Sequence, residues 1–285
     1  MAKLVIGSNK QNGVPAIVKE VGVQPSLGTK NIVANGTYNA SSDNYDGYSS
    51  VTVNVPASTV SEPYLEYEIA QISSTSSVIR PSRTTSHLIP LSGFTTIDSY
   101  CFARAYLYNT AISGTATFTD LKDIATEYSC YFMFSNSTIT GISCPVLTSV
   151  TGNYAMAYIA SDSQVSMFNF PLLQTVGSTA FSRAFANCTN LTTGVFPALN
   201  SIKSSGVFSN TFAGCVNLAS LSFPALKSNS FGSYTNQFNN MLSGVTGCTV
   251  HFPSNLQSVI GSWSDVQNGF GGTNTTVLFD LPQTE

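Results

Sequence analysis

Three acidic residues lie close enough in the sequence to suggest acid–base chemistry. Asp120, Asp123 and Glu127 are three and four residues apart, which would place their carboxylates on one face of a helix. A hydrolytic enzyme would need a pair of carboxylates of this kind in a cleft. Because the 14 acidic residues are otherwise scattered, we interpret these three as a solvated face and predict no catalytic residues.

Other motifs that could carry chemistry are sparse. The two histidines, His87 and His251, each stand within two residues of a position in the repeat described below, which favours a place at the edge of the repeats. The sequence has no GxGxxG, GxxxxGK[ST] or HExxH motif, so we expect no cofactor. Residues 43–47, Asp-Asn-Tyr-Asp-Gly, lack the full ligand series of a calcium loop and predict a turn.

The six cysteines could in principle form disulfides or bind a metal ion. They are Cys101, Cys130, Cys144, Cys188, Cys215 and Cys248. There is no CxxC motif, and no histidine lies near a cysteine pair, so we expect no metal site. Cys188 and Cys215 each stand nine residues before a repeat proline, which places them in the same slot of successive repeats. We interpret this slot as a small, buried packing position.

A regular spacing is the strongest signal in the chain. Dipeptides such as Phe-Pro recur along it, and their second residues are Thr119, Pro145, Pro171, Pro197, Pro224 and Pro253. These second residues are 26, 26, 26, 27 and 29 positions apart. A fixed period in the range of roughly 20 to 50 residues indicates stacked units that complete one another's core. We therefore predict a repeat solenoid, leucine-rich-repeat-like, of short parallel strands stacked with turns or short helices between them.

Apolar residues hold fixed places around each dipeptide. A leucine follows it within one to three residues, and an isoleucine or valine usually lies five or six residues on, as at Ile124 and Val150. Leu218 stands six residues before Pro224, and Leu221 stands three before it. This apolar ladder predicts a short parallel strand, and the proline, which cannot donate a ladder hydrogen bond, predicts the point where the strand ends.

Two further positions recur upstream of the strand. An aromatic residue is followed three or four residues later by a second apolar residue, the spacing of one helical turn. The aromatic position is held by Phe102, Tyr131, Phe181 and Phe208. Asn190 and Asn217 stand one position before the leucine, where an inward amide would satisfy backbone groups at a turn.

The start of the chain lacks the repeat. Residues 1–60 predict a small N-terminal β arm, with a hairpin turn at residues 12–13 and a strand in which Val51, Val53 and Val55 alternate with polar residues. The arm is too small to hold a core of its own. We therefore expect it to pair with another chain or to pack against the solenoid.

The remaining boundaries follow from changes in composition. Residues 61–87 are rich in Ser and Thr and predict a linker and capping segment. The repeats are predicted over residues 88–260, beginning with a degenerate copy at Leu88–Leu91. Residues 261–285 predict a C-terminal cap that contains a strand at Thr276–Asp280.

Composition and charge disfavour several classes of partner. Charged residues make up 9% of the chain, the net charge is -3 and Lys plus Arg number only 11. Without a basic stripe to neutralise phosphates, we expect no nucleic acid partner. No apolar run approaches the length of about 18 residues that a membrane span requires. The apolar run of three residues before Gly7 is too short for a secretory signal peptide.

The clearest copies of the repeat resemble a known family. Phe185-Ala-Asn-Cys-Thr-Asn-Leu and Phe212-Ala-Gly-Cys-Val-Asn-Leu each lead to Phe-Pro-Ala-Leu. This order resembles the BspA-type leucine-rich repeats of bacterial and phage surface proteins, over roughly residues 88–260. The resemblance implies a scaffold for adhesion or recognition, although the repeat of this chain is longer than that family commonly uses.

A second resemblance lies in residues 31–55. The stretch Asn-Ile-Val-Ala-Asn-Gly-Thr-Tyr-Asn-Ala-Ser-Ser-Asp-Asn-Tyr-Asp-Gly-Tyr-Ser-Ser-Val-Thr-Val-Asn-Val looks like a short module of tail and other structural proteins of phages and prophages of gut bacteria. It implies a virion protein released by lysis, with an N-terminal arm that docks on the particle and a projecting repeat domain.

We therefore expect a non-enzymatic phage virion structural protein, that is, a fibre, spike or decoration protein. Its expected partners are other virion proteins, through the arm, and a host-surface glycan or protein. The Ser, Thr and Asn side chains of the strands, the tyrosines and Trp263 would suit either surface partner. A fibre would be a homotrimer. A bacterial cell-surface adhesin of the same repeat family is the alternative, and a hydrolytic enzyme is a third hypothesis.

Overall fold

The computed structural model describes the backbone of five short N-terminal strands and, from residue 88 onward, most of the chain with its side chains. The described residues are 31–32, 36–38, 51–53, 67–73, 76–81, 88, 91, 95–97, 99–233 and 236–283. The predicted hairpin turn at residues 12–13, the predicted turn at residues 43–47 and His87 lie outside them.

The N-terminal strands pair in antiparallel fashion. β2 (Gly36–Tyr38) pairs with β3 (Val51–Val53), so the strand predicted around Val51 is confirmed over these residues. β4 (Tyr67–Ser73) lies between β1 (Asn31–Ile32) and β5 (Ser76–Pro81) and pairs with both. These strands therefore differ in kind from the parallel ones that follow.

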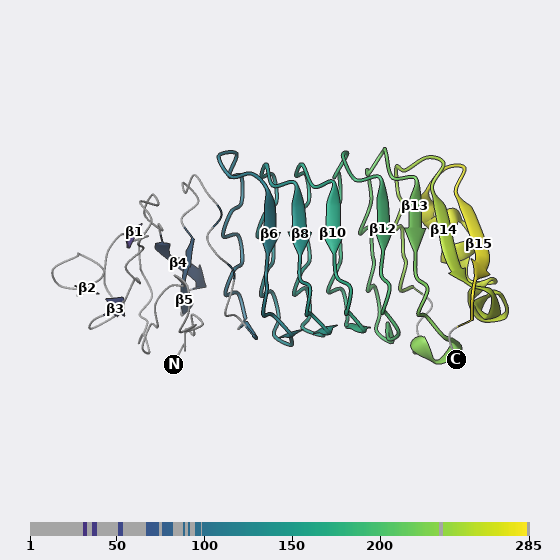
Figure 1. Ribbon diagram of the computed structural model, residues 1–285, viewed down its shortest axis with the longest axis horizontal. Helices are drawn as coiled ribbons and strands as arrows, with labels where there is room; N and C mark the ends of the chain where they lie inside the picture. Colours follow the sequence, from purple (N-terminus) through teal and green to yellow (C-terminus); the bar gives the residue numbers. More distant parts are fainter. Residues whose placement is uncertain are drawn as a thin grey trace.

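Short parallel strands repeat along the rest of the chain and lie side by side in Figure 1. They are β6 (Thr115–Thr117), β8 (Gly141–Ser143), β10 (Met167–Asn169), β12 (Thr193–Val195), β13 (Ser220–Ser222), β14 (Thr249–Pro253) and β15 (Thr276–Leu281). Their first residues are 26, 26, 26, 27, 29 and 27 positions apart, so the predicted parallel strands and their period are confirmed. We call this row the first ladder, and the chain from one of its strands to the next is one coil.

A second ladder runs along the stack and was not predicted. It consists of β7 (Asp123–Ile124), β9 (Ser149–Val150) and β11 (Thr175–Val176), again parallel. Single bridges extend it, from Thr96 to Asp123 at one end and from Ile202 to Phe231 at the other. Its sequence signal was the isoleucine or valine that follows each dipeptide, whose side chains are buried at Ile124, Val150, Val176 and Ile202.

Turn segments form the third side of each coil. They span residues 99–108, 127–136, 153–162, 178–187, 205–214 and 237–244. Alternate N–H groups bond to the next coil, as Phe185 N–H does to Thr211 O at 3.0 Å. The N–H groups between them close local turns, as Ala186 N–H does to Arg183 O at 3.2 Å. Successive coils are thus hydrogen-bonded on up to three sides.

The helical turn predicted for the aromatic positions is wrong. In the turn segment 178–187, Thr179, Arg183 and Asn187 have φ values of 51°, 52° and 59°. This left-handed conformation costs an L-residue about 1 to 2 kcal/mol and interrupts a right-handed helix. The spacing of four residues is real, but it belongs to a turn with a left-handed residue at every fourth position.

Helices are few and short in the described part of the chain, and most lie near the C-terminal end. They are η1 (Ser228–Ser230), η2 (Ser254–Leu256), α2 (Gln257–Ile260), α3 (Ser264–Gln267) and η3 (Gly269–Gly271). The predicted terminal strand is confirmed as β15, which pairs parallel with β14 and continues the first ladder. The C-terminal residues therefore extend the stack and also cover its end.

A continuous apolar core fills the coils. The leucines after the dipeptides are fully buried in every coil: Leu121, Leu147, Leu173, Leu199, Leu226 and Leu256. The phenylalanines before the prolines stack from coil to coil, with ring centroids 5.4 Å apart for both Phe196–Phe223 and Phe223–Phe252. Burying one such side chain contributes about 1.5 to 3 kcal/mol. The result is a repeat-like, β-rich fold of short parallel strands in stacked sheets.

Two finer predictions need correction. The interior aromatic position of the coil between β6 and β8 is held by Cys130, which is fully buried, whereas Tyr131 is half-buried at the surface. Asn190 and Asn217 are exposed and do not point inward. Asn217 donates across coils to Thr189 O at 2.8 Å, so its amide does bond the backbone, but from outside.

The first ladder is interrupted between β10 and β12, where Figure 1 shows a wider gap. Elsewhere the residue before the proline donates to the next strand, as Cys144 N–H does to Asn169 O at 2.9 Å and Phe196 N–H does to Ser222 O at 3.0 Å. The equivalent Phe170 N–H has no backbone acceptor across the gap among the described residues. The sheet therefore opens at this point, while the other two sides of the coils stay bonded.

Phe168 gives a physical reason for the opening. Its ring stacks on Phe185 of its own coil at a centroid distance of 4.9 Å and lies tilted against Phe196 of the next coil at 5.0 Å. It occupies the space that a side chain at Gly194 would need, because a Cβ there would lie 2.8 Å from the Phe168 ring. The ring thus fills the interior of two coils and holds their strands apart.

Candidate functional site

The acidic residues noted in the sequence do not form a common site. Asp123 lies in β7 and accepts a hydrogen bond from Ser149 Oγ at 2.6 Å. Asp120 accepts one from Thr119 Oγ1 at 2.8 Å, and Glu127 is exposed in a turn segment. Residues 120–127 form no helix that could align the three carboxylates, so these face different neighbours. In the described part of the chain, no group of three His, Cys, Asp or Glu residues is placed to hold a metal ion.

The cysteines are free thiols inside the stack, and all six are buried. Cys188 and Cys215 occupy the same slot, as the spacing predicted: Cys188 Sγ donates to Ala160 O at 3.1 Å and Cys215 Sγ to Phe185 O at 3.0 Å. Each bond ties a turn segment to the preceding coil. Burial raises the pKa of the Cys188 thiol to about 11, so this thiol stays protonated near neutral pH.

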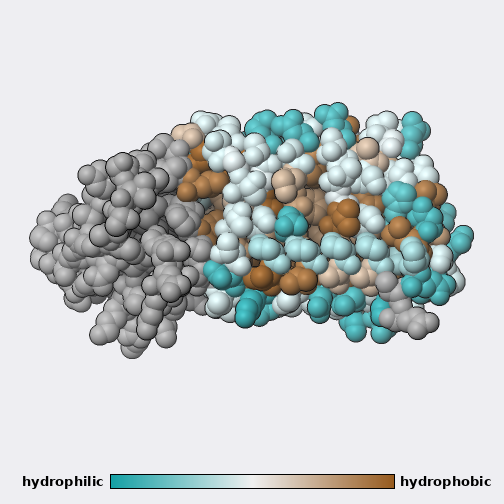
Figure 2. Space-filling view, viewed as in Figure 1, coloured by the Kyte–Doolittle hydropathy of each residue, from teal (hydrophilic) through white to brown (hydrophobic). Residues whose placement is uncertain are grey.

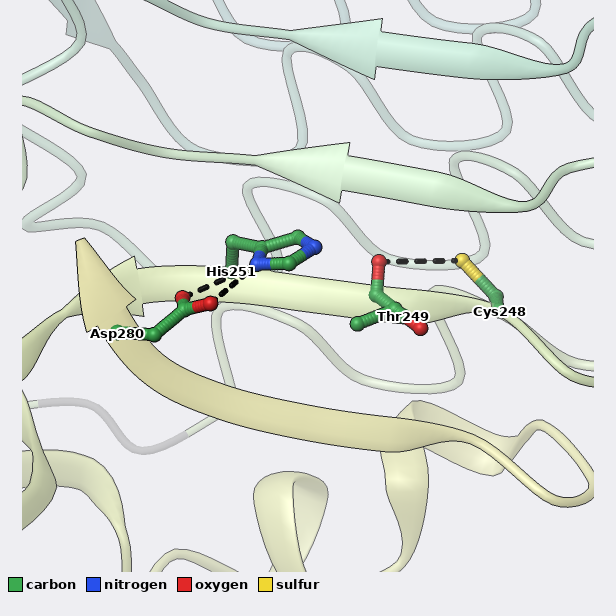
Figure 3. Close-up of polar contacts among 4 residues, drawn as sticks. All are labelled: Cys248, Thr249, His251 and Asp280. Carbon is green, nitrogen blue, oxygen red and sulfur yellow. Dashed lines mark hydrogen bonds and ion pairs between the residues drawn. The ribbon is translucent and has the colours of Figure 1, made fainter.

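His251 and Asp280 form a surface pair at the C-terminal end of the first ladder (Figure 3). His251 Nδ1 lies 3.0 and 3.1 Å from the two carboxylate oxygens of Asp280, which joins β14 to β15. A carboxylate on Nδ1 is the arrangement that orients a catalytic histidine. Ser222 pairs with His251 in the strand register, but no hydroxyl or thiol of the described residues bonds to Nε2.

The outer side of the first ladder is mainly polar, with apolar residues in its middle part (Figure 2). Met167 of β10 is 47% exposed and Val195 of β12 is 49% exposed, although most neighbouring strands carry Ser and Thr there. The gap between the two strands forms a shallow cleft of about 210 Å³, which also includes Phe168 and Gly194. The strand face expected to bind a partner is therefore not uniformly polar.

The turn segments present a second surface, which the sequence did not predict. Residues at the left-handed positions align from coil to coil in columns. The first column stacks Tyr100, Tyr128 and Tyr154, with ring centroids 5.0 and 5.3 Å apart. The second column stacks Phe132 on Tyr158 at 4.3 Å. Rings from two columns thus lie side by side along the stack.

We call this surface the aromatic ridge. It comprises the rings Tyr100, Tyr128, Tyr131, Phe132, Tyr154 and Tyr158, with Arg104 and Arg183 at its two ends. All of the rings are half-buried, and both arginines are exposed. The guanidinium of Arg183 lies 5.8 Å from the Tyr158 ring centroid, within cation–π range.

Burial and neighbouring groups raise the pKa of two tyrosines of the aromatic ridge. Partial burial raises the pKa of Tyr100, and the nearby Glu127 carboxylate raises it further. Partial burial also raises the pKa of Tyr131, with smaller effects from neighbouring tyrosines. The ridge tyrosines with these shifts therefore keep their hydroxyl protons near neutral pH and can act as hydrogen-bond donors.

Trp263, which was expected at a binding surface, instead packs at the C-terminal end. Its ring meets Phe231 edge to face at a centroid distance of 5.1 Å and contacts the core. The aromatic ridge was missed because its tyrosines lie far apart in the chain. The one signal that could have indicated it was the recurrence of aromatic residues four apart, as at Tyr128 and Phe132 or at Tyr154 and Tyr158.

No protein-family model, curated protein or solved structure matches this chain. Within the described residues, no helix has the length and apolar character needed to cross a membrane.

Proposed function

We propose that this chain is a non-enzymatic structural protein of a bacteriophage particle, and that its repeats form a leucine-rich-repeat-like solenoid that serves as a recognition scaffold. In this proposal, residues 1–60 attach to the particle and residues 88–260 project from it. The partners of the arm are other virion proteins, and the partner of the repeats is a glycan or protein on the host surface.

The resemblance of residues 31–55 to a module of phage structural proteins carries the assignment to a particle. The stacked strands support the recognition role, because repeat folds present long regular surfaces to their partners. The aromatic ridge adds to this support, since surface clusters of tyrosine and arginine are typical of binding surfaces.

Mass spectrometry of particles purified on a density gradient tests the proposal. Peptides of this chain should co-purify with the coat protein at a constant ratio, and a fibre should contain the chain in multiples of three. An antibody against residues 88–260 should label intact particles in electron micrographs. A chain that is absent from particles and fractionates with the cell envelope would instead establish the adhesin alternative.

A further inference from the structure

In the first coils, bulky residues occupy the left-handed positions of the turn segments. The fold does not require bulky side chains at these positions. Tyr128, Phe132, Tyr154 and Tyr158 have φ values of 53°, 54°, 53° and 54°. Glycine adopts this conformation freely and asparagine tolerates it, whereas bulky residues rarely adopt it. Such outliers concentrate at functional sites.

Later coils show what the backbone alone needs at the same positions. The left-handed residues there are Gly206, Asn210, Gly214, Asn240 and Gly244. These coils keep the same pattern of hydrogen bonds, with Asn210 N–H donating to Asn239 O at 2.9 Å. The aromatic rings of the earlier coils therefore serve a purpose beyond the path of the chain.

Positive charge lies on both sides of the aromatic pair in the second column, which Asn210 and Asn240 continue beyond Arg183. Reading along the stack, the column contains Arg104, Phe132, Tyr158 and Arg183. These are the two arginines whose side chains the structure describes, in a protein with a net charge of -3. Asp162, the acidic residue of the third column, accepts a hydrogen bond from Asn187 at 2.8 Å and lies outside the second column. The ridge thus offers aromatic surface between two exposed cations.

The repeat distance of the aromatic ridge distinguishes between polymers that could lie along it. Its stacked rings are 4.3 to 5.3 Å apart. Side chains on one face of an extended peptide are two residues apart, or about 7 Å, which does not match this interval. One pyranose unit of a polysaccharide is comparable in length to the interval. Because the rings stack face to face, they present their edges along the ridge, where the hydroxyls of a sugar unit bond the tyrosine hydroxyls.

We propose that an acidic polysaccharide binds along the aromatic ridge, with its anionic groups paired to Arg104 and Arg183 and its sugar rings against Phe132 and Tyr158. This inference deepens the proposed recognition role and rests on it. Carboxylate and phosphate are both anions that a guanidinium binds in bidentate fashion. The ridge accommodates either group, and the experiment below separates them.

Binding of the purified full-length chain to immobilised polymers tests the inference by biolayer interferometry. The probes are polygalacturonate, which carries carboxylates on its sugar rings, phosphorylated dextran, which carries phosphates on its sugar rings, and neutral dextran. We expect binding to at least one anionic polymer, weakened at high salt, and none to neutral dextran. The double variant Arg104→Gln/Arg183→Gln should lose at least tenfold in affinity. Lys122→Gln/Lys203→Gln removes the same charge from exposed residues outside the turn segments and should bind like the wild type.

A second double variant separates binding from folding. Phe132→Asn/Tyr158→Asn places at these positions the residue that later coils use, as at Asn210 and Asn240. It should melt at or above the wild-type temperature and lose at least tenfold in affinity. Equal binding to neutral dextran, no binding to either anionic polymer, or unchanged binding by either ridge variant would each overturn the inference. If the chain is found in particles but binds neither anionic polymer, the proposed function stands and this inference alone fails.

Discussion

The residue directly after each turn segment, which we call the slot, shows how one side chain can fasten a coil. Ser137 and Ser163 fill it with hydroxyls that donate to the carbonyl three residues earlier, at 2.7 and 2.6 Å. Cys188 and Cys215 fill it with thiols that reach the preceding coil. In these four coils the slot therefore holds a small donor, either oxygen or sulfur, whereas Val245 fills it after the turn segment 237–244 with a buried apolar side chain.

Cys188 should make stability depend on pH in the alkaline range. Its pKa is raised from an ordinary value of 9.0 to about 11 by burial. The unfolded chain therefore loses this proton first, and the stabilisation is complete below pH 9 and lost as the pH rises towards 11. We expect the free energy of unfolding to fall by roughly 2 to 3 kcal/mol from this group across that window.

Urea unfolding of Cys188→Ser at several pH values measures the contribution. Serine occupies the slot in the neighbouring coil, so the variant should match the wild type within about 1 kcal/mol at pH 7. The alkaline fall should be smaller in the variant, because the tyrosines and the other thiols titrate in both proteins. Parallel curves for the two proteins between pH 9 and 11 would contradict the prediction.

Gln237 is a residue whose replacement should stabilise the fold. It is fully buried, and its side-chain nitrogen and oxygen have no hydrogen-bond partner among the described residues. Val207 and Ala180 hold the equivalent position in the preceding coils. A buried amide without partners costs about 1 to 3 kcal/mol. Gln237→Leu should therefore raise the free energy of unfolding in urea by that amount, whereas a lower value would show that the amide is satisfied.

At the scale of the element, the opening between β10 and β12 has a cause that substitution can remove. Phe168 fills the space above Gly194, and Ile142 takes the matching position in β8, where the strands are paired. Phe168→Ile combined with Gly194→Ala should let β10 approach β12. Gly194→Ala alone should destabilise the fold by about 1 to 3 kcal/mol, because its Cβ would lie 2.8 Å from the Phe168 ring, a contact that Phe168→Ile removes. The end of the Leu221 side chain, at 2.7 Å from that Cβ, can shift in either variant.

Hydrogen exchange measures whether backbone amides are hydrogen-bonded across the gap between β10 and β12. In the wild type, the Phe170 amide should exchange faster than the Cys144 and Phe196 amides, which donate to the next strand at 2.9 and 3.0 Å. In Phe168→Ile/Gly194→Ala, the Phe170 amide should become protected to a similar degree. Slow exchange of Phe170 in the wild type would mean that the ladder is continuous.

The turn segments mark the limit of what the sequence could predict about the elements. Phe181 and Phe185 are four residues apart, and a helix and this turn both place such residues on one side. The difference lies in the backbone at Thr179 and Arg183, two residue types that rarely adopt a left-handed conformation. Residue preference therefore favoured the wrong element, while the apolar spacing was correct.

For the whole molecule, the period predicted the parallel strands and the buried leucines, because stacking forces equivalent residues into equivalent places. The aromatic ridge could not be found in this way. Tyr100, Tyr128, Tyr154 and Thr179 follow one another at intervals of 28, 26 and 25, while the strands after them, β6, β8, β10 and β12, keep intervals of 26. The sequence spacing of the turn residues thus differs from that of the strands, and the alignment of the turn residues in columns is visible only in the stacked coils.

If each coil meets only its neighbours, removing one complete coil should leave a folded protein. Deletion of residues 141–166 removes the chain from the start of β8 to the start of β10 and joins Thr140 to Met167, so every later strand keeps its place in the ladder. The deletion brings Ala116 of β6 next to Phe168 of β10. These side chains differ in size, but they do not clash because alanine is small. We expect a cooperative thermal transition at a lower temperature than in the wild type, and an unchanged circular dichroism spectrum per residue.

Deletion of residues 141–153 is the matched control, because it removes half of one coil. It would bring a turn segment against a strand, so buried leucines would meet polar positions and the hydrogen bonds between coils would lose their partners. This variant should be unfolded or aggregated. If both deletions fold equally well, or both fail, the stability of the molecule does not come from contacts between successive coils, and the spacing of the Phe-Pro dipeptides has another origin.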